Sequence, residues 1–235
     1  MSKRAIILAG GKGTRLKPFT IALPKPLVPI GEKPVLGIII EQLVNNDFDH
    51  ITLAINHLAD IIKAVFGTGE KWGVKIDYSL ENKALSTMGP LSLINDLPEN
   101  FLIMNGDVLS DINYKEFYNS HVSEQNIFTI SSYKRIQLTD YGVLEIGGDD
   151  LLTGFKEKPK VEYEVSMGIY MANKEILKYI PKNQPYGFDN LMIDLIKNRK
   201  PAKVKRHNGY WLDIGRPDDY EKACDDIEQL FTGVK

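Results

Sequence analysis

The sequence predicts an α/β protein: a single domain built as an α/β/α sandwich around a Rossmann-like, doubly wound, mixed but mostly parallel sheet. Short apolar runs alternate with segments of helical periodicity through the first half of the chain, which is the order of parallel strands joined by crossover helices. At 235 residues and 43% hydrophobic, the chain is long and apolar enough for one large core. It has no internal repeat, low-complexity tract or Gly/Ser linker, so we expect residues 1–235 to form one domain.

In the first half, each expected strand is a short apolar run that ends near a glycine or a polar residue. The run at 4–9 is the most apolar, as expected for a central strand buried on both faces. Pro34 suits the first turn of a helix. We expect strands at 4–9, 50–56, 74–79 and 101–105, and helices at 34–46, 58–66 and 86–97. Gly89 and Pro90 confine the regular part of the last helix to its later half.

The second half changes character, because its strands are separated by short turns. This pattern predicts a more antiparallel extension of the same sheet. We expect a cap at Asp111 for a helix that starts near Asn113. The other expected elements are strands at 126–133, 142–146, 151–156, 165–171 and 202–206, and helices at 173–179, 188–199 and 217–230.

Composition narrows the classes of partner. The 29 basic and 31 acidic side chains give a net charge of −2, which does not favour nucleic acid or an anionic membrane. The single cysteine, Cys224, suits a reducing compartment. The first apolar run is too short for a signal peptide, and no segment approaches the roughly twenty apolar residues of a membrane span. We therefore expect a soluble, cytoplasmic protein.

The stretch 8–29, LAGGKGTRLKPFTIALPKPLVP, is a Gly-rich turn directly after the first apolar run. Its glycines leave backbone N–H groups open to phosphate oxygens. Arg15 offers a planar fork of donors, and Lys25 is a compact charge held between two prolines. The string is neither a P-loop, which needs GxxxxGK and then Ser or Thr, nor a dinucleotide fingerprint, whose third glycine is replaced by Leu16. It therefore predicts a different kind of nucleotide loop.

The order GGxGTRL…PKPLxPI resembles the signature of sugar-1-phosphate nucleotidyltransferases, also called nucleotide-sugar pyrophosphorylases, and the resemblance extends from Ala5 to about Tyr220. It implies a nucleotide-binding half at about 1–110 and a sugar-binding half at about 111–235. It also implies that Arg15 and Lys25 are catalytic. The implied nucleotide-binding residues are Leu8, Ala9, Gly10, Gly11, Lys12, Gly13, Thr14, Glu81 and Gly89.

Two aspartates are candidate ligands of Mg²⁺. Asp107 directly follows a buried strand, where a carboxylate lies at the rim of the sheet, and Mg²⁺ prefers one or two carboxylates together with phosphate oxygens and water. Asp213 lies in YWLDIGRPDDY, after the strand expected at 202–206. The resemblance implies a metal-binding Asp at both places. The alternative is that each aspartate caps a turn or a helix.

For the sugar phosphate, the resemblance implies binding by Gly142, Glu157, Lys158 and Gly168. Glu157 and Lys158 belong to an EKP string, in which the carboxylate would accept hydrogen bonds from sugar hydroxyls and the ammonium would neutralise the phosphate. Gly142 and Gly168 would let the backbone approach the sugar. A solvated ion pair on a turn and simple strand kinks are the alternatives.

The choice of base depends on the segment LENKALSTMGPL. Glu81 could pair with the N1–H and exocyclic amine of guanine, which favours GTP over uracil and thymine nucleotides. Ser86 and Met88 replace a Gly and an Ala that many relatives carry there. The four histidines show no ligand spacing, and a sugar phosphate, with a second pKa of about 6, is already an anionic nucleophile near neutral pH.

The resemblance implies transfer of a nucleoside monophosphate from an NTP to a sugar 1-phosphate. The chain is closest in appearance to bacterial enzymes like mannose-1-phosphate guanylyltransferase, which supply precursors of surface polysaccharides. The alternatives are thymidylyl, uridylyl or cytidylyl transfer to glucose 1-phosphate, guanylyl transfer to a heptose or amino-sugar 1-phosphate, and a non-catalytic regulatory homologue. A glycosyltransferase would need a DxD motif, which Asp107-Val108-Leu109 lacks. The expected partners are the NTP, the sugar 1-phosphate and further copies of the chain in a homo-oligomer.

Overall fold

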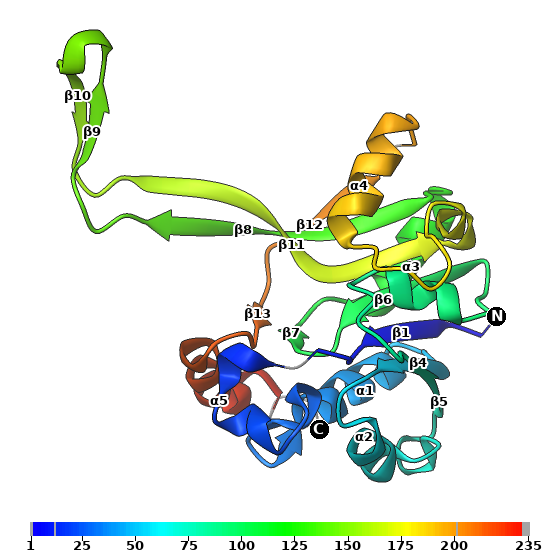
Figure 1. The fold of residues 1–235 in the computed structure, drawn as a ribbon. Helices are drawn as coiled ribbons and strands as arrows, with labels where there is room; N and C mark the ends of the chain where they lie inside the picture. Colours follow the sequence, from blue (N-terminus) through cyan, green and yellow to red (C-terminus); the bar gives the residue numbers. More distant parts are fainter. Residues whose placement is uncertain (1, 12, 201, 232–235) are drawn as a thin grey trace.

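The computed structural model describes the chain except residues 1, 12, 201 and 232–235 and the side chains of 228–231. Its centre is a seven-stranded sheet in the order β12-β8-β11-β6-β1-β4-β5 (Figure 1). The strands, in chain order, are β1 (Arg4–Leu8), β4 (His50–Ile55), β5 (Lys75–Leu80), β6 (Asn100–Asn105), β8 (Phe128–Leu138), β11 (Lys160–Asn173) and β12 (Lys203–His207).

Only β11 runs against its neighbours in this sheet. β1 pairs in parallel with β4 and β6, β4 with β5, and β12 with β8, whereas β11 is antiparallel to both β6 and β8. The expected mixed, mostly parallel sheet is therefore confirmed. In the second half, β11 is antiparallel to both of its neighbours and only β12 pairs in parallel, so this part of the sheet is more antiparallel than the first half, as its short turns predicted.

Two hydrophobic cores lie on opposite faces of the sheet, because successive side chains of a strand point to opposite faces. On β1, Ala5 and Ile7 belong to the core under the helices α1 and α2, whereas Ile6 belongs to the core under α4. Figure 1 shows α4 on one side of the sheet and α1 and α2 on the other. The helices are α1 (Val35–Asn45), α2 (Ala59–Phe66), α3 (Tyr114–Ser123), α4 (Phe188–Lys197) and α5 (Pro217–Phe231).

Three short strand pairs lie outside the central sheet. They are β2 (Pro29–Ile30) with β3 (Lys33–Pro34), β7 (Val108–Ser110) with β13 (Trp211–Asp213), and β9 (Val143–Ile146) with β10 (Leu152–Lys156). The strands expected at 142–146 and 151–156 therefore form a hairpin of their own and do not extend the sheet. The strand predicted at 202–206 is the sheet-edge strand β12, and Asp213 lies after it in the chain, at the end of the further short strand β13.

Two expected helices are single 3₁₀ turns. The segment predicted at 86–97 is helical only at Gly89–Leu93, because the amides of Met88 and Gly89 donate to the carbonyl of Tyr186 instead of to their own chain segment. The segment predicted at 173–179 is a 3₁₀ turn at Lys174–Lys178.

The predicted cap of α3 is also wrong. The side chain of Asn113 caps the helix by accepting from the amide of Glu116. Asp111 instead accepts from the amide of Tyr210, at 2.7 Å. Its carboxylate therefore links the segment just after β7 to the residue just before β13, and it does not serve the helix.

The hairpin of β9 and β10 stands on a two-stranded ribbon that leaves the sheet. β12 pairs with β8 only as far as Tyr133, and β6 pairs with β11 only from Ile169 onward. Figure 1 shows the ribbon of β8 and β11 and its terminal hairpin extending away from the body of the molecule. We call residues 134–165 the arm.

None of the described helices is both long enough and apolar enough to span a bilayer.

Candidate active site

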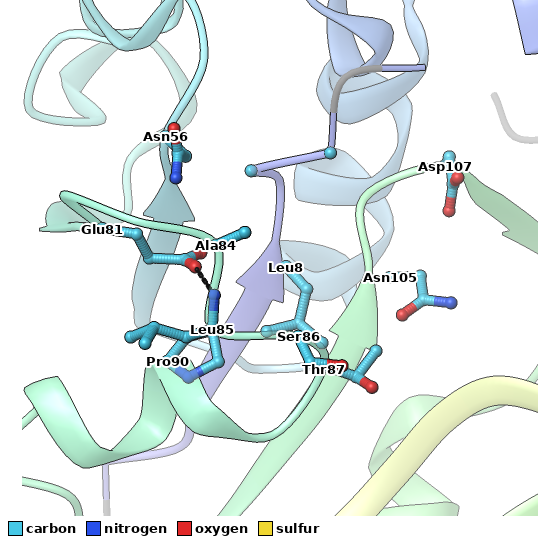
Figure 2. Close-up of a pocket in the computed structure, with 12 residues that line it drawn as sticks. Leu8, Asn56, Glu81, Ala84, Leu85, Ser86, Thr87, Pro90, Asn105 and Asp107 are labelled. Atoms are coloured by element: carbon cyan, nitrogen blue, oxygen red, sulfur yellow. Dashed lines mark hydrogen bonds between the residues drawn. The ribbon is translucent and has the colours of Figure 1, made fainter. Parts of the chain in front are cut away.

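The carboxyl ends of four parallel strands meet at one edge of the sheet and line a pocket of about 360 Å³. Leu8 ends β1, Asn56 follows β4, Glu81 follows β5 and Asn105 ends β6. Figure 2 shows Asn56 and Glu81 on one side of the pocket and Asn105 and Asp107 on the other. The remaining lining residues are Gly10, Gly11, Ala84, Leu85, Ser86, Thr87 and Pro90.

Glu81 is a buried carboxylate that also holds the loop beside it. Its Oε2 accepts from the amide of Leu85 at 3.2 Å, the contact drawn in Figure 2. A Cβ added to Gly10 would lie 2.9 Å from the other oxygen, Oε1. Burial raises the pKa of Glu81, and the Leu85 amide partly offsets this effect. One carboxylate oxygen is therefore committed to the loop, and the other lies beside the glycine turn.

The loop after Glu81 is fixed by contacts with a distant segment. The Leu85 carbonyl accepts from the amide of Tyr186, and the Thr87 hydroxyl accepts from the amide of Phe188 at the start of α4. Between them, Ser86 has φ +63°, a left-handed backbone conformation that residues other than glycine rarely adopt. These contacts hold Ser86 at the pocket wall in that conformation.

On the other side of the pocket, Lys25 forms an ion pair with Asp107. Lys25 lies in a 3₁₀ turn, Lys25–Leu27, in which the amide of Leu27 donates to the carbonyl of Pro24. Its side chain is almost fully buried, and the flanking prolines restrict the backbone. The prediction that prolines fix Lys25 thus has a structural counterpart in a short, rigid turn.

Asp213 is brought next to Asp107 by the pairing of β13 with β7. In that ladder Asp213 faces Val108, and the amide of Ile214 donates to the carbonyl of Asp107 at 2.9 Å. Burial raises the pKa of Asp213, and the negative charge of Asp107 raises it further. The positive charges of Lys25 and Arg15 act in the opposite direction. Two carboxylates and two cations from four separate segments therefore share one site.

The two carboxylates suit a divalent cation. Oδ1 of Asp213 is buried and has no hydrogen-bond partner among the described residues, so it is an acceptor without a donor. Within the described part of the chain, no group of three or more His, Cys, Asp or Glu side chains is arranged as a metal cage. A pair of carboxylates without further protein ligands fits Mg²⁺ that is also held by phosphate oxygens and water.

The residues predicted to bind the nucleotide do not all line the pocket. Leu8, Gly10, Gly11 and Glu81 line it, whereas Ala9 is buried in the core beneath it. Gly13, at φ +60°, packs against Thr20 and Lys25, and Thr14 begins an exposed 3₁₀ turn that contains Arg15. Gly89 lies behind the loop, with its amide bonded to Tyr186. Lys12 lies outside the described residues.

The predicted sugar-phosphate residues fall in two places. Gly168, at φ +75°, is packed against Asn105 at the pocket: an added Cβ would lie 2.6 Å from Nδ2 of Asn105. Gly142, Glu157 and Lys158 lie on the arm. An added Cβ on Gly142 would lie 3.3 Å from the Glu157 carboxylate, so these two are neighbours, but none of the three lines the pocket.

Two pocket residues were missed at the level of sequence. Asn56 and Asn105 were each placed at the end of a predicted strand but were assigned no role. The signal was present, because the rule that points to Asp107, a polar side chain at the carboxyl end of a parallel strand, applies equally to these two amides. Ser86 was considered only as a departure from a pattern and Thr87 was given no role, although both line the pocket.

Comparison with known proteins agrees with this geometry. Residues 4–230 match the family model described as nucleotidyl transferase. Among curated relatives, UTP–glucose-1-phosphate uridylyltransferase of Synechocystis is 34% identical over 94% of this chain, and mannose-1-phosphate guanyltransferase of Saccharomyces cerevisiae is 32% identical over 92%. The chain spans 62% of the length of each.

Among solved structures, HddC from Yersinia pseudotuberculosis is 29% identical, with a TM-score of 0.75 over 96% of this chain and 99% of that one. It has also been solved in complex with GMP-PN, where the TM-score is 0.72.

Proposed function

Because this chain belongs to the nucleotidyl transferase family, we propose that it transfers a nucleoside monophosphate from an NTP to a sugar 1-phosphate and releases pyrophosphate. The observation that carries the proposal is the convergence of Arg15, Lys25, Asp107 and Asp213 beside a pocket lined by the glycine turn. Two cations and two carboxylates at the rim of a pocket match the needs of a reaction between two phosphate-bearing substrates.

The chemistry needs placement and charge neutralisation rather than a protein nucleophile. An oxygen of the sugar phosphate, already anionic near neutral pH with a second pKa of about 6, attacks the α-phosphorus of the NTP. The bond from the α-phosphorus to the bridging oxygen breaks, and pyrophosphate leaves on the opposite side. No side chain has to remove a proton from the nucleophile.

Arg15 and the backbone amides of the glycine turn would hold the β- and γ-phosphates. Lys25, fixed by its rigid turn, would neutralise charge that builds on the α-phosphate during transfer. We propose that Asp107 and Asp213 hold Mg²⁺, which would supply Lewis-acid stabilisation of the phosphate oxygens. The unpartnered buried oxygen of Asp213 supports this assignment.

GTP is the favoured nucleotide in this proposal. One support is the carboxylate oxygen of Glu81 that lies beside the glycine turn and does not accept from the Leu85 amide. The others are a relative that is a mannose-1-phosphate guanyltransferase and a structural neighbour solved with GMP-PN. The uridylyltransferase relative keeps UTP as the main competitor. A cytoplasmic location is also part of the proposal, supported by the lone free thiol of Cys224.

The test is a matrix of the four common NTPs and dTTP against mannose, glucose, heptose and amino-sugar 1-phosphates, scored by pyrophosphate release with Mg²⁺ present. We expect at least one pair to react, with GTP the best donor and no release when the sugar phosphate is omitted. A regulatory homologue would give no release with any pair. A reaction with another NTP but never with GTP would overturn the assignment of the base.

A further inference from the structure

Thr20 is a buried polar residue in an otherwise exposed segment. Residues 17–23 follow the glycine turn, and Thr20 alone among them is buried, with 5% of its surface exposed. The apolar side chains of Phe19 and Ile21, on either side of it, are exposed. Folding normally buries the apolar residues of such a segment, and burying a hydroxyl costs free energy unless it forms a hydrogen bond. The position of Thr20 therefore indicates a specific partner.

That partner is the backbone of the glycine turn. The Thr20 hydroxyl donates to the carbonyl of Gly13 at 2.7 Å. Its methyl group packs at the same point, since a Cβ added to Gly13 would lie 2.9 Å from Cγ2 of Thr20 and 3.1 Å from Cβ of Lys25. Gly13 has φ +60°, which glycine adopts without strain. Gly13, Thr20 and Lys25 thus meet at one point.

The hydrogen bond from Thr20 determines the direction in which the next amide faces. The peptide that joins Gly13 to Thr14 is trans and planar, so its C=O and its N–H point in opposite directions. Its carbonyl accepts from the Thr20 hydroxyl and, at 3.0 Å, from the amide of Leu16. The N–H of Thr14 is therefore directed away from both donors, and it has no acceptor among the residues that the structure describes. An amide held open in this way suits a phosphate oxygen.

The opposite orientation of this peptide would oppose phosphate binding. A carbonyl oxygen would then take the place of the N–H, and its partial negative charge would repel a phosphate. The Leu16 amide belongs to a 3₁₀ turn of three residues, Thr14–Leu16, and a turn of this kind has poor hydrogen-bond geometry. Thr20 holds the same carbonyl from outside the turn, so it supplies the constraint that the turn itself provides only weakly.

We propose that Thr20 is a positioning residue for the nucleotide: its buried hydroxyl fixes the peptide between Gly13 and Thr14 so that the Thr14 amide is presented to the triphosphate. The inference rests on the proposed function for the assignment of the triphosphate to the glycine turn. Thr20 acts through the backbone and does not itself contact a substrate. The proposal therefore predicts a defect in phosphate binding rather than in the binding of the base.

Two substitutions separate the hydrogen bond from the packing. Thr20→Val keeps the shape and removes the hydroxyl. The Leu16 amide still donates to the Gly13 carbonyl in this variant, so no backbone acceptor loses its last donor and the cost to folding should be small. Thr20→Ser keeps the hydroxyl and removes the methyl group that packs beside Gly13 and Lys25. A role in packing alone predicts a defect in Thr20→Ser, whereas the proposal predicts one in Thr20→Val.

The first test measures binding without turnover. Calorimetric titrations use three probes in the presence of Mg²⁺: the NTP that reacts best, its nucleoside, and inorganic tripolyphosphate. We expect Thr20→Val to bind the NTP and tripolyphosphate about tenfold more weakly, which equals about 1.4 kcal/mol and suits the loss of one hydrogen bond. Its affinity for the nucleoside, and all three affinities of Thr20→Ser, should stay close to those of the wild type. Unchanged tripolyphosphate binding in Thr20→Val, or an equal loss for the nucleoside, overturns the proposal.

The second test separates KM from kcat. Thr20→Val should raise KM for the NTP about tenfold, with kcat and the KM for the sugar phosphate nearly unchanged, and Thr20→Ser should restore the KM for the NTP. Ile21→Val is the matched control, because it removes one methyl group from an exposed side chain of the same turn. A loss in kcat alone, or a defect in Thr20→Ser as large as that in Thr20→Val, contradicts the role of the hydroxyl. A wild type that binds neither the NTPs nor tripolyphosphate refutes instead the proposed function of the glycine turn.

Discussion

Lys25 and Asp107 form an ion pair although 82 positions separate them in the chain. Each residue is placed by its own segment: a proline-flanked turn fixes Lys25, and Asp107 follows the end of β6. The pair joins the glycine-turn segment to the carboxylate side of the site. Substitutions here should therefore affect the chemical step more than the fold.

We expect Lys25→Ala to lower kcat at least a hundredfold, because it removes the fixed positive charge nearest the two carboxylates. Arg15→Ala should cause a loss of similar size, through weaker hold on the β- and γ-phosphates. Lys17→Ala is the matched control, since Lys17 is an exposed lysine in the same segment. The measurement is pyrophosphate release under saturating substrates, with circular dichroism to confirm folding. Near-normal rates in both Lys25→Ala and Arg15→Ala would contradict the assigned roles.

The acidic pair gives a prediction about pH and stability. Folding raises the pKa of the Asp213 carboxyl above its ordinary value of 3.8. At pH values between the ordinary pKa and the raised one, this carboxyl therefore binds more protons in the folded chain than in the unfolded chain. The contribution of Asp213 to the free energy of unfolding therefore falls as pH rises through that interval, and it stays low at neutral pH. Removing the charge should stabilise the chain while abolishing its activity.

We therefore expect Asp213→Asn to raise Tm at pH 7, with the gain shrinking toward pH 4. A gain of 1 kcal/mol corresponds to roughly 2–4 °C for a chain of this size. Millimolar Mg²⁺ should raise the Tm of the wild type and leave that of Asp213→Asn unchanged. The measurement is thermal unfolding of both proteins from pH 4 to 8, with and without the metal. A variant less stable than the wild type at pH 7 would show that Asp213 is structural.

The glycine turn offers a matched pair of substitutions. A Cβ at Gly10 would lie 2.9 Å from the Glu81 carboxylate and 3.2 Å from Cβ of Asn56, whereas a Cβ at Gly11 would meet no atom of the described residues within 4 Å. Both variants keep the backbone N–H. We expect Gly10→Ala to lower kcat/KM for the NTP at least tenfold and Gly11→Ala to lower it clearly less. The opposite order would mean that the turn meets the phosphates with a different face from the one proposed.

The fold was predictable where a local pattern determined the element. The strands ending at Leu8, Ile55 and Asn105 are apolar runs bounded by glycine or polar residues, and their parallel pairing follows from the intervening helices. The predicted helix at 86–97 is wrong because the amides of Met88 and Gly89 bond to Tyr186, about a hundred positions away. No periodicity in a short window reports such a contact.

The site, like the fold, was predictable only where the local sequence determines the position of a residue. Asp107 follows from its place after β6, but its proximity to Asp213 depends on the pairing of β7 with β13, which is long-range. The short turns of the second half indicated the two strands β9 and β10 but not the sheet to which they belong, because a turn does not specify the pairing partner beyond its own hairpin. The position of Glu157 on a projecting arm, rather than beside the pocket, was therefore beyond local sequence reasoning.

The last prediction separates two roles of Glu81. In Glu81→Gln the amide oxygen can still accept from the Leu85 amide, so the loop is retained, but the group beside the pocket becomes a donor. Guanine presents N1–H and an exocyclic amine, so it loses its acceptor and meets donor against donor. We expect kcat/KM for GTP to fall ten- to a hundredfold, and that for UTP to change by less than threefold. Equal losses for the two nucleotides would show that Glu81 acts only by positioning the loop. A displaced loop weakens the binding of every base alike, whereas a carboxylate that hydrogen-bonds to guanine affects only guanine nucleotides.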